Sequence, residues 1–136
     1  MRRKKMYAFA VIIIALITIA FAVFATDIDE INAEFLSEYG WEIDEECIEF
    51  SDIIIPDQFD LVYENYNKMQ LESGFDLRPY KGMKGKRYTY IVKNYPIKLD
   101  EEVHANVICI DSKPIGGDIC TVSLDGFMHG LNDILK

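Results

Sequence analysis

The hydrophobic and polar positions divide the chain into one long apolar run and a mixed remainder. Twenty consecutive residues, from Met6 to Ala25, carry no charge. At ~1.5 Å per helical residue this run reaches about 30 Å, the thickness of the hydrocarbon core of a membrane. Four basic residues precede it at positions 2–5, and acidic residues follow from Asp27. The pattern predicts that residues 1–25 are an N-terminal membrane anchor, with a transmembrane helix through residues 6–25, or a signal segment.

The charges that flank this run predict where the rest of the chain lies. Basic residues stay on the cytoplasmic side of a membrane, so we expect a single pass through the cell membrane with the C-terminal domain outside. The alternative is secretion, because Val23, Phe24 and Ala25 offer small residues at the spacing of a cleavage site. The length of the apolar run favours a retained anchor over cleavage near Ala25.

The remaining residues, 26–136, are predicted to form a single extracytoplasmic domain that contains two helices. The first either begins after Asp27, a good N-cap residue, or continues directly from the apolar run, and it ends at Gly40. The second begins at Pro56, which suits a first helical turn, and ends at Gly74. Apolar residues recur at helical spacing in both segments. They are Ile28, Ile31, Phe35, Leu36 and Tyr39 in the first, and Phe59, Val62, Tyr63, Tyr66 and Met69 in the second.

Alternating or continuous apolar residues predict strands between and after these helices. The predicted strands are Trp41–Ile43, Cys47–Ile54, Arg87–Lys93, Val103–Ile110 and Ile115–Leu124. Gly116 and Gly117 indicate a bulge or a close backbone approach in the last of these. Residues 75–85 are predicted to be an ordered loop, and residues 125–136 a final helical turn or two. Short turns between strands favour an antiparallel meander. The predicted fold is α+β, with two helices packed on a small antiparallel β-sheet.

The charge of the chain narrows the possible partners. It contains 14 basic and 23 acidic residues, and four of the basic ones belong to positions 2–5, so the exported part has a net charge of −13. This charge argues against nucleic acid as a partner, because binding to a phosphate backbone requires a basic surface.

Three cysteines, Cys47, Cys109 and Cys120, lie in the exported part. An odd number leaves one free thiol or implies pairing between chains. A hairpin centred between Ser112 and Lys113 would place Cys109 opposite Gly116 and Cys120 opposite Ala105. The two are then not cross-strand neighbours, and small buried side chains in strands are the favoured interpretation.

Several short motifs appear in a distinctive order. They are Pro56-Asp57-Gln58-Phe59, Tyr63, Tyr66-Asn67, Gln70, Gly74-Phe75-Asp76-Leu77, Tyr80-Lys81-Gly82, Tyr88-Thr89-Tyr90, Asn94-Tyr95, Ile115-Gly116-Gly117-Asp118-Ile119-Cys120 and Leu124-Asp125-Gly126-Phe127-Met128. Together they resemble the uncharacterised bacterial family catalogued as domain of unknown function 4830, over about residues 35–131. The resemblance implies one domain behind an N-terminal membrane segment and no assigned chemistry.

Charged residues separate into two blocks. Fourteen acids and no base lie between Asp27 and Glu64, whereas six bases and no acid lie between Arg78 and Lys93. A solvated acidic face and an edge strand protected by lysines would explain both blocks without a binding function. Ion pairs between the two blocks within one molecule would cancel their charges. The alternative is a basic and aromatic patch that binds a protein or an anionic envelope component. Its predicted binding residues are Arg78, Lys81, Lys84, Lys86, Arg87 and Tyr88, next to Tyr80 and Tyr90.

No catalytic residue, cofactor or metal site is predicted. A thiol hydrolase would use Cys120 as the nucleophile and His129 as the base, with Asp118 or Asp125 to orient the base. Cysteines and histidines lack the paired spacing of a zinc site. The leading hypothesis is therefore a non-enzymatic, membrane-tethered binding or interaction module. A small secreted thiol hydrolase and a purely structural stalk are the alternatives.

Overall fold

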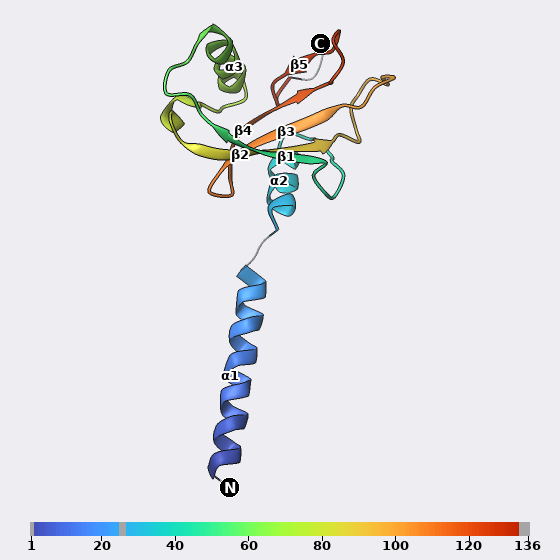
Figure 1. Cartoon of the computed structure of the whole chain (residues 1–136). Helices are drawn as coiled ribbons and strands as arrows, with labels where there is room; N and C mark the ends of the chain where they lie inside the picture. The colour runs from blue at the N-terminus through green and yellow to red at the C-terminus, as the bar shows by residue number, and fades with distance from the viewer. Residues whose placement is uncertain (1, 25–26, 134–136) are drawn as a thin grey trace.

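A computed structural model describes residues 2–24 and 27–133 of the chain (Figure 1). Three α-helices and a five-stranded antiparallel sheet make up these residues, which confirms the α+β class. The strands follow one another across the sheet in chain order, as a meander. The elements are α1 (Arg2–Phe24), α2 (Ile28–Ser37), β1 (Glu49–Ile54), α3 (Leu61–Glu72), the 3₁₀ helix η1 (Arg78–Tyr80), β2 (Lys84–Ile91), β3 (His104–Ile110), β4 (Lys113–Cys120) and β5 (Met128–His129).

Within the described ranges, no helix reaches the length and hydrophobicity of a membrane span. The predicted cleavage point at Ala25 lies outside the described residues.

Helices α2 and α3 pack against opposite faces of the sheet (Figure 1). The side chains of Tyr90, Val107 and Ile119 lie on one face with Leu36 of α2, and we call it the α2 face. On the other side, the α3 face, Ile108 and Ile110 pack with aromatic residues of α3. Neighbouring residues of β3 thus serve two separate cores, because side chains alternate along a strand. This explains why all seven residues of β3 are buried.

The first predicted helix is confirmed as α2. The side chain of Asp27 caps it by accepting a hydrogen bond from the backbone N–H of Asp29 at 3.2 Å. After the helix, Gly40 adopts a φ of +85°, which favours glycine. The hydroxyl of Tyr90 in β2 donates to Asp29 at 2.7 Å and accepts from Asn32 at 2.9 Å, so the helix is hydrogen-bonded to the sheet beneath it.

The second predicted helix starts later than its sequence pattern indicates. Helix α3 begins at Leu61, and its N-cap is Asp60, whose carboxylate accepts a hydrogen bond from Tyr63 N–H at 2.8 Å. Pro56 therefore lies before the helix. Val62, predicted to face the core, is 76% exposed. The correction has a physical reason, since a side-chain oxygen that satisfies a free N–H group defines a helix start more strongly than a proline does.

Polar side chains form the buried face of α3. Gln70 is fully buried, and its amide bonds both backbone groups of Gly117 in β4: Nε2 donates to the carbonyl at 2.8 Å, and Oε1 accepts from the N–H at 2.9 Å. Strand β5 pairs with β4 only at Ile119 and Cys120. The Gln70 amide thus bonds Gly117 as a peptide group of a longer β5 would. It completes the hydrogen bonding along this edge of β4. Asn67 similarly accepts from Leu77 N–H at 2.8 Å.

The β3–β4 hairpin differs in register from the prediction. Its turn residues are Asp111 and Ser112, with φ of 50° and 61°, which fits a two-residue hairpin turn. A register shift between Ile108 and Cys109 places Cys109 opposite Pro114, and Cys120 lies opposite His104. All three cysteines are free.

The chain after β4 is a third correction. A short strand, β5, and turns occupy the described part of residues 125–133, where helical turns were predicted. Trp41 holds this segment: its ring N–H donates to the carbonyl of Leu131 at 2.9 Å, and its ring stacks on Tyr95. The helix-like spacing of apolar residues in the tail therefore reflects contacts with aromatic residues that are distant in sequence. Residues 134–136 lie outside the described ranges.

Candidate functional site

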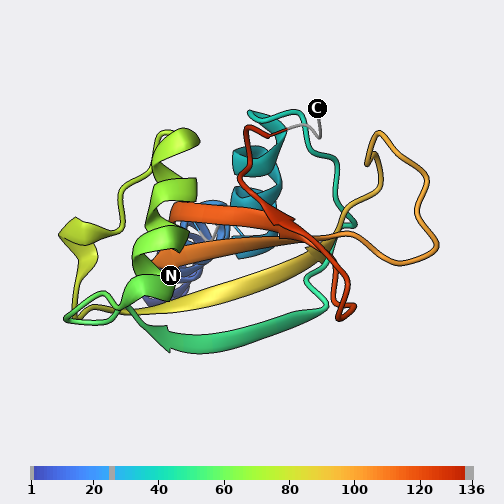
Figure 2. The ribbon, with the colours of Figure 1, turned by 90° about the horizontal axis from the view of Figure 1, so that it is seen from above.

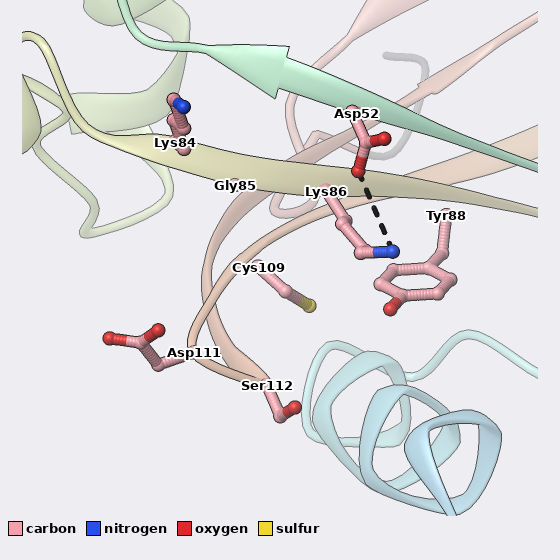
Figure 3. A pocket seen from close by; sticks show the side chains of 8 residues that line it. All are labelled: Asp52, Lys84, Gly85, Lys86, Tyr88, Cys109, Asp111 and Ser112. Atoms are coloured by element: carbon pink, nitrogen blue, oxygen red, sulfur yellow. Dashed lines mark ion pairs between the residues drawn. The ribbon is translucent and has the colours of Figure 1, made fainter.

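Three of the six predicted binding residues line one pocket on the α2 face (Figure 3). Lys84, Lys86 and Tyr88 alternate along β2 and therefore share this face. The pocket has a volume of about 270 Å³ and lies between β2 and the β3–β4 turn. Its lining residues are Asp52, Lys84, Gly85, Lys86, Tyr88, Cys109, Asp111 and Ser112.

An exposed ion pair lies at the mouth of this pocket. Lys86 Nζ is 3.5 Å from Asp52 Oδ1 across the β1–β2 pair, and the Asp52 side chain is 88% exposed. The same ammonium lies 5.4 Å from the ring centroid of Phe50, which stacks on Tyr88. Ion pairs this exposed contribute little to stability, so the lysine can exchange one carboxylate for another anion at small cost.

The buried thiol of Cys109 lies in the same pocket. It donates a hydrogen bond to Asn32 Oδ1 at 3.3 Å, and burial raises its pKa to about 11. Because the thiolate is the reactive form, a thiol that stays protonated at neutral pH is a poor nucleophile. The pocket therefore combines two lysines, two aspartates and an aromatic ring, and its thiol is not activated as a nucleophile.

The structure places the other three predicted residues elsewhere. Arg78 forms a 2.7 Å ion pair with Asp76, whose pKa is held well below its usual value mainly by hydrogen bonds from Arg78. Lys81 lies over the ring of Phe59, 4.7 Å from its centroid. Arg87 lies on the α3 face, because its neighbours Lys86 and Tyr88 face α2. The six residues do not form one continuous patch.

A second pocket, on the α3 face, contains Arg87. It has a volume of about 390 Å³ and extends over all five strands beside α3. The lining residues are Ile53, Ile54, Val62, Tyr63, Tyr66, Arg87, Asn106, Ile108, Asp118 and Met128. Sequence reasoning missed Asn106 and considered Asp118 only as an orienting residue of the thiol hydrolase, although a polar residue inside each of two apolar strands was a visible signal.

Hydrogen bonds connect the polar residues at the floor of this second pocket. Buried Asp118 accepts from the Tyr66 hydroxyl at 2.6 Å and from Asn106 Nδ2 at 2.9 Å. Thr89 Oγ1 donates to Asn106 Oδ1 at 2.7 Å. Burial raises the pKa of Asp118 above its ordinary value, while these donors and the charge of Arg87 oppose the shift. Burial likewise raises the pKa of Tyr66.

The residues of the alternative thiol hydrolase lie on opposite faces of the sheet. Cys120 accepts a hydrogen bond from Asn106 at 3.3 Å on the α3 face, and burial raises its pKa. His129 pairs with Ile119 and bonds Tyr95 at 3.0 Å on the α2 face. An imidazole on the far side of a strand does not reach the thiol as a base. In residues 2–24 and 27–133, no three His, Cys, Asp or Glu side chains cluster as a metal site would require.

The fold and its two pockets define a small α+β domain built on a five-stranded meander sheet. The family model for the domain of unknown function DUF4830 matches residues 35–119, and the chain belongs to this family. No curated protein and no solved structure matches the chain.

Proposed function

We propose that this protein is a non-enzymatic, membrane-tethered module that binds an anionic component of the cell envelope outside the membrane. The observation that carries the proposal is the pocket in which Lys84, Lys86 and Tyr88 lie together on the α2 face. An anion that displaces the Asp52 carboxylate would pair with Lys86, and the protein would lose only an exposed ion pair in exchange. Tyr88 adds a ring and a hydroxyl at the pocket wall, a combination typical of binding sites.

Charge reversal tests this binding site. We expect the double substitution K84E/K86E to weaken binding to poly(glycerol phosphate) at least about tenfold at low salt, because it replaces two attractions by two repulsions. Binding is measured by biolayer interferometry on the purified chain, and rising NaCl concentration should weaken it. K68E/K98E is the matched control, since it changes the net charge equally at exposed lysines outside the pocket. Equal loss in both double variants would contradict a local site.

The tether is the second part of the proposal. It is supported by the uncharged run of residues 6–25 and by the apolar side chains that α1 exposes on all sides. Exposed apolar residues of α1 are Met6, Phe9, Val11, Ile12, Ile13, Ile14 and Leu16. A surface-lying amphipathic helix would instead present one polar face.

Alkaline carbonate extraction of membranes tests the tether. We expect the native chain in the membrane pellet and I12R/L16R in the supernatant, because each central arginine costs about 2.5–3.5 kcal/mol on insertion. A substitution pair in the exposed β2–β3 loop, I97R/K98R, is the control and should stay in the pellet. A mature protein whose mass begins after Ala25 would favour the secreted alternative.

A further inference from the structure

The pocket on the α3 face shares no lining residue with the proposed anion site. Helix α3 lies across one end of the sheet (Figure 2), and the pocket follows its flank over the strands. Its volume of about 390 Å³ falls in the range of small-molecule sites, about 300–1,000 Å³.

Most polar groups at the floor of this pocket already have partners. Asp118 accepts two hydrogen bonds, and Asn106 bonds both Asp118 and Thr89. Groups that are satisfied within the protein gain little from a ligand. These hydrogen bonds hold the floor of the pocket rigid. Recognition of a ligand then depends on the other side chains of the pocket.

Arg87 and the Tyr63 hydroxyl are the exceptions among the polar lining residues that the structure describes. The Arg87 side chain is exposed, and it forms no ion pair with any residue that the structure describes. It is also the one cation among the described residues that line the pocket. A guanidinium presents five donors in a planar fork, which matches a carboxylate in two parallel hydrogen bonds.

The walls around Arg87 are largely apolar and partly open to solvent. Val62 of α3 and Met128 of β5 are 76% and 54% exposed, and Ile53 and Ile108 lie deeper. An occupant with an apolar body would remove these side chains from water, at about 25 cal/mol for each Å² covered.

We infer that this pocket binds a small organic carboxylate with an apolar or aromatic body, whose carboxylate pairs with Arg87. The apolar body lies against Ile53, Val62 and Met128, over the hydrogen-bonded floor of Tyr66, Asp118 and Asn106. The ligand class follows from Arg87, the one cation among the described lining residues, and from the apolar walls, and it is independent of the anion site on the opposite face.

Isothermal titration of the full chain with 2-naphthoate tests the inference. We expect saturable one-to-one binding, weakened about tenfold or more in Arg87→Gln, because a charge-assisted hydrogen bond is lost. Val62→Glu should weaken it similarly, because it places a negative charge at an exposed wall position. The neutral isostere 2-naphthamide should bind the native chain about tenfold more weakly than 2-naphthoate.

Lys98→Gln is the matched control, since it removes one exposed positive charge at a lysine that lines neither of the two pockets. It should leave 2-naphthoate binding unchanged even if the anion site on the α2 face fails its own test. Trp41 fluorescence reports whether each variant is folded. Equal binding by Arg87→Gln, equal affinity for the amide, or no saturable binding to the folded native chain would each overturn the inference.

Discussion

Replacing Gln70 by alanine is expected to lower the free energy of unfolding by about 3 kcal/mol, because two buried backbone groups lose their partners. The side chain donates to the Gly117 carbonyl and accepts from its N–H, at 2.8 and 2.9 Å. Gln70 is fully buried, so water does not take the place of these bonds without opening the contact between α3 and β4. A loss of this size is a large fraction of the stability of a small domain.

Urea unfolding followed by the fluorescence of Trp41, the single tryptophan, measures this effect. Lys68→Ala is the matched control, because Lys68 lies on the exposed side of the same helix and alanine preserves helix propensity. We expect the control to stay within about 0.5 kcal/mol of the native chain. A Gln70→Ala variant as stable as the control would show that the amide is not needed to close the edge of β4.

Alanine at Gly117 is expected to cost about 2–3 kcal/mol of unfolding free energy, because the added methyl group overpacks the contact between β4 and β3. A Cβ atom there would lie 2.4 Å from the backbone oxygen of Asn106 in β3. A backbone oxygen of a paired central strand moves only if the strand pair separates. The cost of Gly117→Ala in unfolding free energy should therefore be the same whether residue 70 is glutamine or alanine.

Gly116 provides a matched comparison, because its obstacle is a side chain. A Cβ atom at Gly116 would lie 2.6 Å from Gln70 Oε1, and its next neighbours are at 3.4 Å. We expect Gly116→Ala to cost about 1–2 kcal/mol in the native chain and under about 0.5 kcal/mol in the Gln70→Ala background. Gly117→Ala should keep its full cost there. Equal costs for Gly116→Ala in both backgrounds would contradict the assignment of Gln70 as the obstacle.

Much of the secondary structure follows from local patterns that the tertiary structure reinforces. Asp27 and Gly40 mark the ends of the α2 region because a capping carboxylate and a positive φ act within one helical turn. Strand β3 is visible as a continuous apolar run because both of its faces are buried. One error was local, since Asp60 and not Pro56 marks the start of α3. The error in the tail occurred where distant contacts decide. The tail after Asp125 has helix-like apolar spacing, but Trp41 and Tyr95 bind it in an extended form.

The candidate sites show the same division between local and distant effects. The basic block of residues 78–87 is visible in the sequence, and so is the alternation that places Lys84, Lys86 and Tyr88 on one face of β2. The separation of Arg87 from them follows from the same alternation once the strand is known to begin at Lys84. The pocket around Arg87 was not visible, because five strands and a helix distant in sequence contribute to it.

The amino-acid sequence alone defines the long uncharged run at the N-terminus, the acidic charge, the α+β class and the meander of β2, β3 and β4, because charge, hydrophobic periodicity and turn residues act over a few positions. The tertiary structure decides the closure of β4 by Gln70 and the pocket around Arg87, to which five strands and α3 contribute. These features depend on residues far apart in the chain, such as Gln70 and Gly117, which are 47 positions apart. No local sequence pattern identifies such pairs. Each forms only after folding has buried a polar group and left it one hydrogen-bonding partner.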